Sequence, residues 1–157
     1  TPNSTGSTNE IIYGIYNSSS GNVTINNNII MNLANQYAYA TSNSVLSVVG
    51  IYSSSGSNTI TNNTISNLST TYGSSGTGST ASVIGIYLSS STAGQLISKN
   101  NINSNHNSNA VASTSIIGIY YSGPTTGNNI IEKNFIHSLS LSAANASASI
   151  NGIYVNG

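Results

Sequence analysis

The sequence predicts an all-β solenoid in which each repeat of 33–36 residues forms about one coil. Three observations lead to this fold class. One motif recurs five times at nearly constant spacing, which is the signature of a repeat architecture. Short apolar alternations are separated by Ser, Gly and Asn clusters, and no window shows the 3.6-residue apolar period of a helix, so we expect strands joined by tight turns.

Each repeat is marked by the tripeptide Gly-Ile-Tyr. The spacings between successive motif glycines are 36, 35, 33 and 34 residues, and the residue two positions before each glycine is Ile or Val. We expect the motif isoleucines to stack about 4.8 Å apart as an interior column of one parallel sheet. These isoleucines are Ile15, Ile51, Ile86, Ile119 and Ile153.

An asparagine recurs 13–16 residues after each of the first four motif glycines, between two apolar positions. Asparagine tolerates left-handed turn conformations, and its amide both donates and accepts hydrogen bonds. We therefore expect these residues to line one turn and to hydrogen-bond along the solenoid axis or to the turn backbone. They are Asn28, Asn63, Asn100 and Asn134.

The size of the coil is open to two readings. Two coils of about 17 residues per repeat are conceivable, but nothing like Gly-Ile-Tyr recurs at the half period, which favours one coil per repeat. A variable tract of Ser, Thr, Ala, Gly and Tyr, such as residues 70–79, precedes the next motif. We read this tract as a loop or an added strand that enlarges each coil.

The stretch from Gly50 to Leu68 combines the Gly-Ile-Tyr motif, a Ser-rich turn and the Asn element. This pattern resembles the repeats of right-handed parallel β-helix proteins. Its Asn/Ser/Thr-rich, charge-poor style resembles repeats of large secreted or surface proteins of Bacteroidota-like bacteria. The resemblance implies a single-stranded, right-handed parallel β-helix at the cell surface or outside the cell, but it implies no single activity, because similar helices serve as polysaccharide lyases, adhesins and spacers.

Composition excludes several classes of partner. Only 3% of the 157 residues are charged and the net charge is zero, so no basic surface is available for nucleic acid. No run approaches the roughly 20 apolar residues that cross a bilayer, so membrane insertion is not expected. We expect residues 1–157 to form one segment of about four to five coils, and the motif that begins at Gly152 suggests part of a longer array or fibre.

Catalytic, cofactor and metal sites are not expected. The chain has no Asp and no Arg, and Glu10 and Glu132 lie more than three repeats apart, so a glycosidase carboxylate pair is not available; we expect both to be solvated or to cap turns. His106 and His137 are the only histidines, and two such ligands without carboxylates make a poor metal site. We expect both histidines in exposed turns.

The motif tyrosines have two readings. If they face outward, they form an aromatic stripe that can stack on sugar rings; otherwise they pack against the core or each other. A bulge at the glycine would reset the strand alternation, so the sequence leaves their direction open. They are Tyr16, Tyr52, Tyr87, Tyr120 and Tyr154. An ice-binding threonine column is not favoured, because Thr24, Thr59 and Thr61 have no matching series in later repeats.

These observations favour a structural module of an extracellular filament, stalk or surface protein. Its expected partners are further repeats of the same chain or another copy of itself, stacked head to tail through open coils. The alternative is a glycan-binding or adhesive β-helix. A polysaccharide-degrading enzyme and an ice-binding protein are less favoured.

Overall fold

The computed structural model describes residues 10–36, 46–110 and 112–157. The described chain is a parallel β-solenoid of about four turns, with all strand pairs parallel and a single short helical segment, the 3-10 helix η1 (Gly78–Thr80). The predicted all-β solenoid is thus confirmed. The right-handed sense implied by the resemblance stays a prediction.

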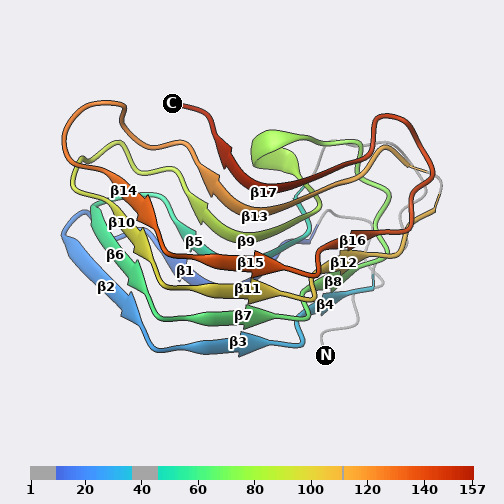
Figure 1. The fold of residues 1–157 in the computed structure, drawn as a ribbon, viewed down its shortest axis with the longest axis horizontal. Coiled ribbons are helices and arrows are strands. Elements are labelled where there is room, and N and C mark those ends of the chain that lie inside the picture. The colour runs from blue at the N-terminus through green and yellow to red at the C-terminus, as the bar shows by residue number, and fades with distance from the viewer. Residues whose placement is uncertain (1–9, 37–45, 111) are drawn as a thin grey trace.

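Each full turn contributes one strand to each of four sheets, which stack along the axis (Figure 1). We call these sheets A, B, C and D. Sheet A contains β1 (Ile12–Asn17), β5 (Val48–Ser53), β9 (Val83–Leu88), β13 (Ser115–Tyr121) and β17 (Ser149–Val155). Sheet B contains β2 (Asn22–Asn26), β6 (Ser57–Thr61), β10 (Leu96–Ser98) and β14 (Ile130–Glu132). Sheet C contains β3 (Ile29–Met31), β7 (Thr64–Ser66), β11 (Asn101–Asn103) and β15 (Phe135–His137). Sheet D contains β4 (Ala34–Asn35), β8 (Ser69–Thr70), β12 (His106–Asn107) and β16 (Ser140–Leu141).

The register of sheet A follows the sequence repeat. Ile15 pairs with Ile51, Ile51 with Ile86, Ile86 with Ile119, and Ile119 with Ile153. Each motif strand therefore lies one whole repeat above the preceding one, so one coil per repeat is correct and the reading with two coils of about 17 residues is wrong. The five isoleucines occupy one column.

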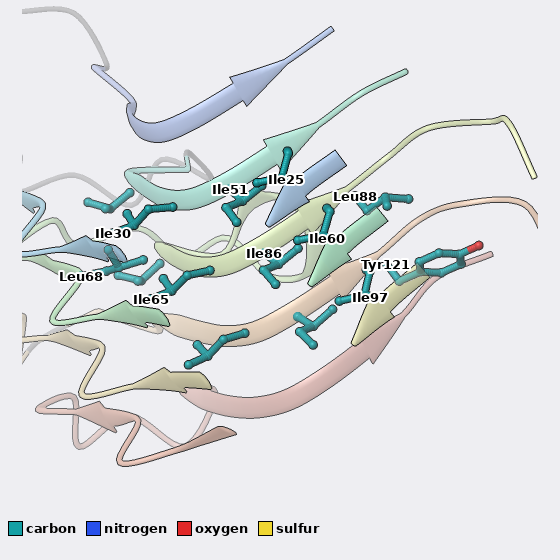
Figure 2. Packing of buried hydrophobic residues seen from close by; sticks show 14 of the residues in the cluster. Ile25, Ile30, Ile51, Ile60, Ile65, Leu68, Ile86, Leu88, Ile97 and Tyr121 are labelled. Carbon is teal, nitrogen blue, oxygen red and sulfur yellow. The ribbon is translucent and has the colours of Figure 1, made fainter. Parts of the chain in front are cut away.

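The interior of the solenoid is a column of mainly aliphatic side chains, joined by the buried ring of Tyr121 (Figure 2). In the second coil, Ile51, Ile60 and Ile65 point into this core and are fully buried. Equivalent isoleucines repeat the arrangement in the third coil, so the hydrophobic burial that stabilises the fold is renewed at each turn. A single coil buries only a few apolar side chains, and the stacking of successive coils joins them into one continuous core.

The motif glycine resets the alternation of each sheet A strand. In β5, Val48 and Ile51 belong to the inner cluster, whereas Val49 and Tyr52 belong to the outer one, so two residues separate the inward-facing side chains. A Cβ at Gly50 would lie 2.5 Å from the Gly85 carbonyl oxygen and 2.6 Å from Ile65 Cγ2. No larger residue fits this bend, which turns the following tyrosine outward.

Two corners of every coil are turned by a residue with positive φ. The corner between sheets B and C uses Asn27, Asn62, Lys99 and Lys133, and the corner between sheets C and D uses Asn32, Asn67, Ser104 and Ser138, all with φ between 53° and 59°. Asparagine takes this left-handed conformation readily, whereas lysine and serine do so less often. The conformation is therefore imposed by the coil geometry rather than by one residue type.

The variable tract of the second repeat folds over the outer face of sheet A. Ala81 packs with Val49 and Ile84 in an outer hydrophobic cluster, and the backbone at Gly78 approaches the ring of Tyr120. Within the predicted tract of residues 70–79, Thr70 ends β8 and residues 71–77 form a loop that leads into η1, so the loop reading describes most of this tract and the strand reading only its first residue. It buries a second, smaller core outside the coil.

We predict that alanine at Gly85 destabilises the protein, whereas alanine at Gly152 does not. The new Cβ at Gly85 would lie 2.5 Å from the Gly118 carbonyl oxygen, and such overpacking costs about 1–3 kcal/mol. Nothing lies within 4 Å of the corresponding position at Gly152, so Gly152→Ala should change stability by less than about 0.5 kcal/mol. Urea denaturation of dilute protein measures both variants; equal effects would contradict the steric role of the motif glycine.

Candidate functional site

The four predicted asparagines form a hydrogen-bonded ladder at the corner between sheets B and C. Each follows the left-handed residue of that corner, which turns its side chain along the solenoid axis. The backbone N–H and the Nδ2 amide of Asn63 both donate to Asn100 Oδ1, at 3.0 and 2.9 Å. The same pair of bonds joins Asn28 to Asn63 and Asn100 to Asn134.

Each rung also has a bond in the opposite direction. Asn63 Nδ2 donates to the Ile25 carbonyl oxygen of the coil below, at 2.9 Å, and Asn100 and Asn134 donate in the same way to Ile60 and Ile97. Asn63 and Asn100 are almost fully buried. Each of these amides therefore meets its hydrogen-bonding needs through its neighbours in the stack, and this arrangement links each coil to the next.

A second amide ladder lies where the chain enters sheet B. The backbone N–H and Nδ2 of Asn58 donate to Gln95 Oε1, both at 3.0 Å, and the Gln95 N–H donates to Asn129 Oδ1 at 3.2 Å. The first coil has Val23 at this position. We did not predict this ladder, although a polar residue two positions before the sheet B isoleucine in three of four coils was a usable signal.

Asn105 occupies a position that is leucine in the other coils and is fully buried. Its Oδ1 accepts a hydrogen bond from the Leu68 backbone N–H at 3.0 Å, but its Nδ2 has no partner among the described residues. Asn105 thus accepts one hydrogen bond from the neighbouring coil but, unlike the ladder asparagines, its side chain donates none to the described residues.

The motif tyrosines form one continuous outer column on sheet A. Successive ring centroids are 5.0, 4.9, 4.9 and 5.5 Å apart from Tyr16 to Tyr154. Tyr13 joins the column at its first coil, with its ring 5.1 Å from Tyr16 and 5.5 Å from Tyr52. The tyrosines therefore face away from the inner core and contact one another, which combines the two alternatives that the sequence left open.

Exposure varies along the tyrosine column. Tyr16 is 57% exposed, Tyr52 and Tyr87 are half-buried, and Tyr120 is only 3% exposed because the loop of residues 71–82 covers it. Tyr16 and Tyr154, at 57% and 37%, are the most exposed rings of the column. The predicted stripe is therefore interrupted.

The ionisable side chains lie apart. Glu10 is exposed, and Glu132 forms a surface ion pair with Lys133, with 3.4 Å between Nζ and Oε1. His106 begins β12 in sheet D and His137 ends β15 in sheet C, both half-buried, so the prediction of exposed turns is wrong for both. The described residues contain no group of three His, Cys, Asp or Glu side chains that could hold a metal ion.

The remaining surface features are limited. Thr24 pairs with Thr59, but Leu96 takes the next position, so the threonine column ends after two coils. A hollow of about 420 Å³ near the last coil is lined in part by Tyr121, Pro124 and Ile131. Among the described residues no helix is long and apolar enough to cross a membrane.

Neither a protein-family model nor a curated protein nor a solved structure matches this chain. The fold is therefore assigned from the strand pairing itself. The link to surface proteins of Bacteroidota-like bacteria stays a prediction.

We predict that Asn100→Leu lowers the free energy of unfolding by about 1–3 kcal/mol, the usual effect of leaving buried polar partners unsatisfied. The substitution removes the acceptor of the Asn63 amides and the donor to the Ile60 carbonyl oxygen. The adjacent Asn101→Leu is the matched control, because Asn101 is half-exposed and the same column has Ile29 and Phe135 in other coils. Thermal and urea denaturation measure the difference; equal losses would show that the ladder position has no special role.

Alkaline pH should destabilise the outer column. Burial raises the pKa of Tyr13 and Tyr87, and charge on neighbouring tyrosines raises it further. A raised folded-state pKa favours the folded protein fully below the unfolded value of about 10, and this contribution is lost as the pH rises through the folded pKa. Melting temperatures should therefore stay level from neutral pH to about pH 9 and fall above about pH 10. Tyr87→Phe should reduce the fall, and an unchanged pH profile in that variant would contradict the assignment.

Proposed function

We propose that this chain is a structural module of an extracellular filament, stalk or surface protein, which stacks end to end through its open coils. The observation that carries the proposal is the amide ladder, in which Asn28, Asn63 and Asn100 each donate in the same direction to the asparagine of the next coil. Among the described residues, no donor reaches Asn28 Oδ1 at one end, and no acceptor meets the Asn134 backbone N–H at the other. One end therefore offers an acceptor and the other a donor.

Apolar burial supports the same conclusion. Ile51, Ile86 and Ile119 are fully buried by the coils on both sides of them, whereas Ile153 in the last strand is 49% exposed. Among the described residues, the first and last strands of each sheet pair with another strand along one edge only, and such a free edge is a template for further parallel pairing. A further coil would bury Ile153 and pair these edges together.

The surface chemistry supports a mechanical rather than a catalytic role. Solubility comes from amides and hydroxyls, and only 3% of residues are charged, so little electrostatic repulsion opposes stacking. The stabilising contacts run from coil to coil along the axis, which suits a stiff rod. The Asn/Ser/Thr-rich repeats of secreted or surface proteins that the sequence resembles support an extracellular location.

A glycan-binding or adhesive β-helix is the second candidate. The observation that favours it is the exposed aromatic surface at the first coils, where the rings of Tyr16 and Tyr52 stack with centroids 5.0 Å apart. Sugar-specific binding on a glycan array that is lost in Tyr16→Ala and kept in Tyr120→Phe would support this function. Absence of binding to any sugar would remove it.

Assembly tests the leading proposal. Purified chain should form rods whose length increases with protein concentration, as followed by light scattering and negative-stain electron microscopy, because head-to-tail contacts do not close on themselves. Phe135→Lys places a charge on the exposed end of sheet C and should suppress rods, whereas Thr71→Lys adds the same charge to the side of the solenoid and should not. A wild-type chain that stays monomeric at all concentrations would contradict the proposal.

A further inference from the structure

A loop of the second repeat reaches over the outer face of sheet A. It connects β8 to β9 and comprises residues 71–82, whereas the tracts that lead to β13 and β17 are the shorter segments 108–114 and 142–148. Its 3-10 helix η1 contacts β13, the strand beyond β9 in sheet A (Figure 1). The extra length of this loop therefore places it over the tyrosine column.

The two ends of this loop are fixed at one point. Asn107 Nδ2, in sheet D, donates to the Tyr72 carbonyl oxygen and to Ser82 Oγ, each at 2.9 Å. The Ser82 N–H and Oγ in turn donate to the Ser115 carbonyl oxygen, at 3.0 and 2.7 Å. A compact surface loop whose ends are held close together is an Ω-loop. The buried Asn107 thus acts as a clasp that fixes where the loop begins and ends.

The body of the loop, residues 73–80, contains only Gly, Ser and Thr. Its own polar groups hold it together, because the Gly76 N–H donates to Ser74 Oγ and the Thr80 N–H and Oγ1 both donate to the Thr77 carbonyl oxygen. No large apolar side chain of the body is therefore available to anchor it on sheet A. A segment with few buried apolar contacts belongs to the least stable part of a fold.

Polar contacts join the body to sheet A. Ser115 Oγ donates to the Gly76 carbonyl oxygen at 2.5 Å, and the Ser79 side chain hydrogen-bonds to the Tyr87 hydroxyl. Ala81, directly after η1, packs in the outer hydrophobic cluster. Loss of these contacts would free the body and leave the clasp in place.

The body covers the tyrosine column. A Cβ at Gly78 would lie 3.6 Å from Tyr120 Cε2, so the Gly78 backbone lies directly against that ring. Tyr120 is 3% exposed, although its ring centroid lies only 4.9 Å from that of Tyr87 and 5.5 Å from that of the exposed Tyr154. Movement of the body would uncover Tyr120 and join the accessible tyrosines into a longer stripe.

We propose that residues 73–81 form a lid, which opens as a unit about the clasp at Asn107 and exposes Tyr120 while the coils stay folded. The lid goes beyond the proposed structural role and lies in the middle of the solenoid. One consequence rests on the second candidate function: a sugar ring that stacks on Tyr120 must bind the open form and would hold the lid open. The lid itself needs no ligand, so its test is independent of glycan binding.

Two cysteine probes test the lid, since the chain has no cysteine. Ala81 in the lid and Val83 in β9 are both fully buried, but Ala81 packs in the outer cluster and Val83 in the inner core. Ala81→Cys should react with a thiol reagent at a rate that changes little at low urea concentration, because lid opening exposes little surface. Val83→Cys should react only through global unfolding, with a steep dependence on urea. Equal urea dependence in the two variants, or no reaction of Ala81→Cys below the unfolding transition, would overturn the lid.

Removal of a lid contact provides a second test. In the Ala81→Cys protein, Ser115→Ala removes the donor to the Gly76 carbonyl oxygen and should raise the labelling rate about fivefold, the factor expected for loss of one buried hydrogen bond. Ser89→Ala is the matched control, because Ser89 Oγ donates to the Tyr52 hydroxyl outside the lid, at 3.4 Å. Its bond is unaffected by lid opening, so the rate should stay within about twofold.

Two results of this second test would contradict the lid. Equal acceleration by Ser115→Ala and Ser89→Ala would show that labelling reports unfolding of the coil. An unchanged rate in Ser115→Ala would show that this contact does not hold the body closed.

Discussion

The rest of the structure depends on parallel pairing in register between successive coils. Ile51 lies on Ile15 and beneath Ile86 because each strand of sheet A pairs with the strand one repeat away. That single constraint turns a loosely repeated sequence into columns of like side chains. Columns of isoleucine exclude water inside, columns of amide bond along the corners, and a column of tyrosine covers part of the outside.

The three kinds of column differ in how they limit the sequence. The glycine of the motif is held by steric contact with the next coil, and the ladder asparagine is held by buried hydrogen bonds in both directions. The side chains of the tyrosine column are less constrained by packing, because they range from the buried Tyr120 to the exposed Tyr16. The outer column is therefore the more exposed of these features, and the Asn63 and Asn100 rungs of the ladder are the more buried.

Much of the fold follows from the sequence because the columns repeat one residue type. The isoleucine column and the Asn28 to Asn134 ladder could be read from spacing alone. The second ladder was harder to predict, since Val23, Asn58, Gln95 and Asn129 share a position but not a residue type. The corners at Lys99 and Ser104 were hidden for a related reason, because their left-handed conformation comes from the neighbouring pairing and not from their own preference. The path of the variable tract depends on packing against Val49 and Ile84, which no local pattern indicates.

Hydrogen exchange of individual side-chain amides tests the central claim most directly, because it reports the hydrogen bonds that join one coil to the next. In ¹⁵N-labelled protein, the Nδ2 hydrogens of Asn63 and Asn100 should exchange slowly, as buried donors with partners above and below. The Nδ2 hydrogens of Asn62, one residue away on the exposed surface, should exchange far faster. Equal and fast exchange at Asn62, Asn63 and Asn100 would show that the coils are not joined by an amide ladder and would contradict this account.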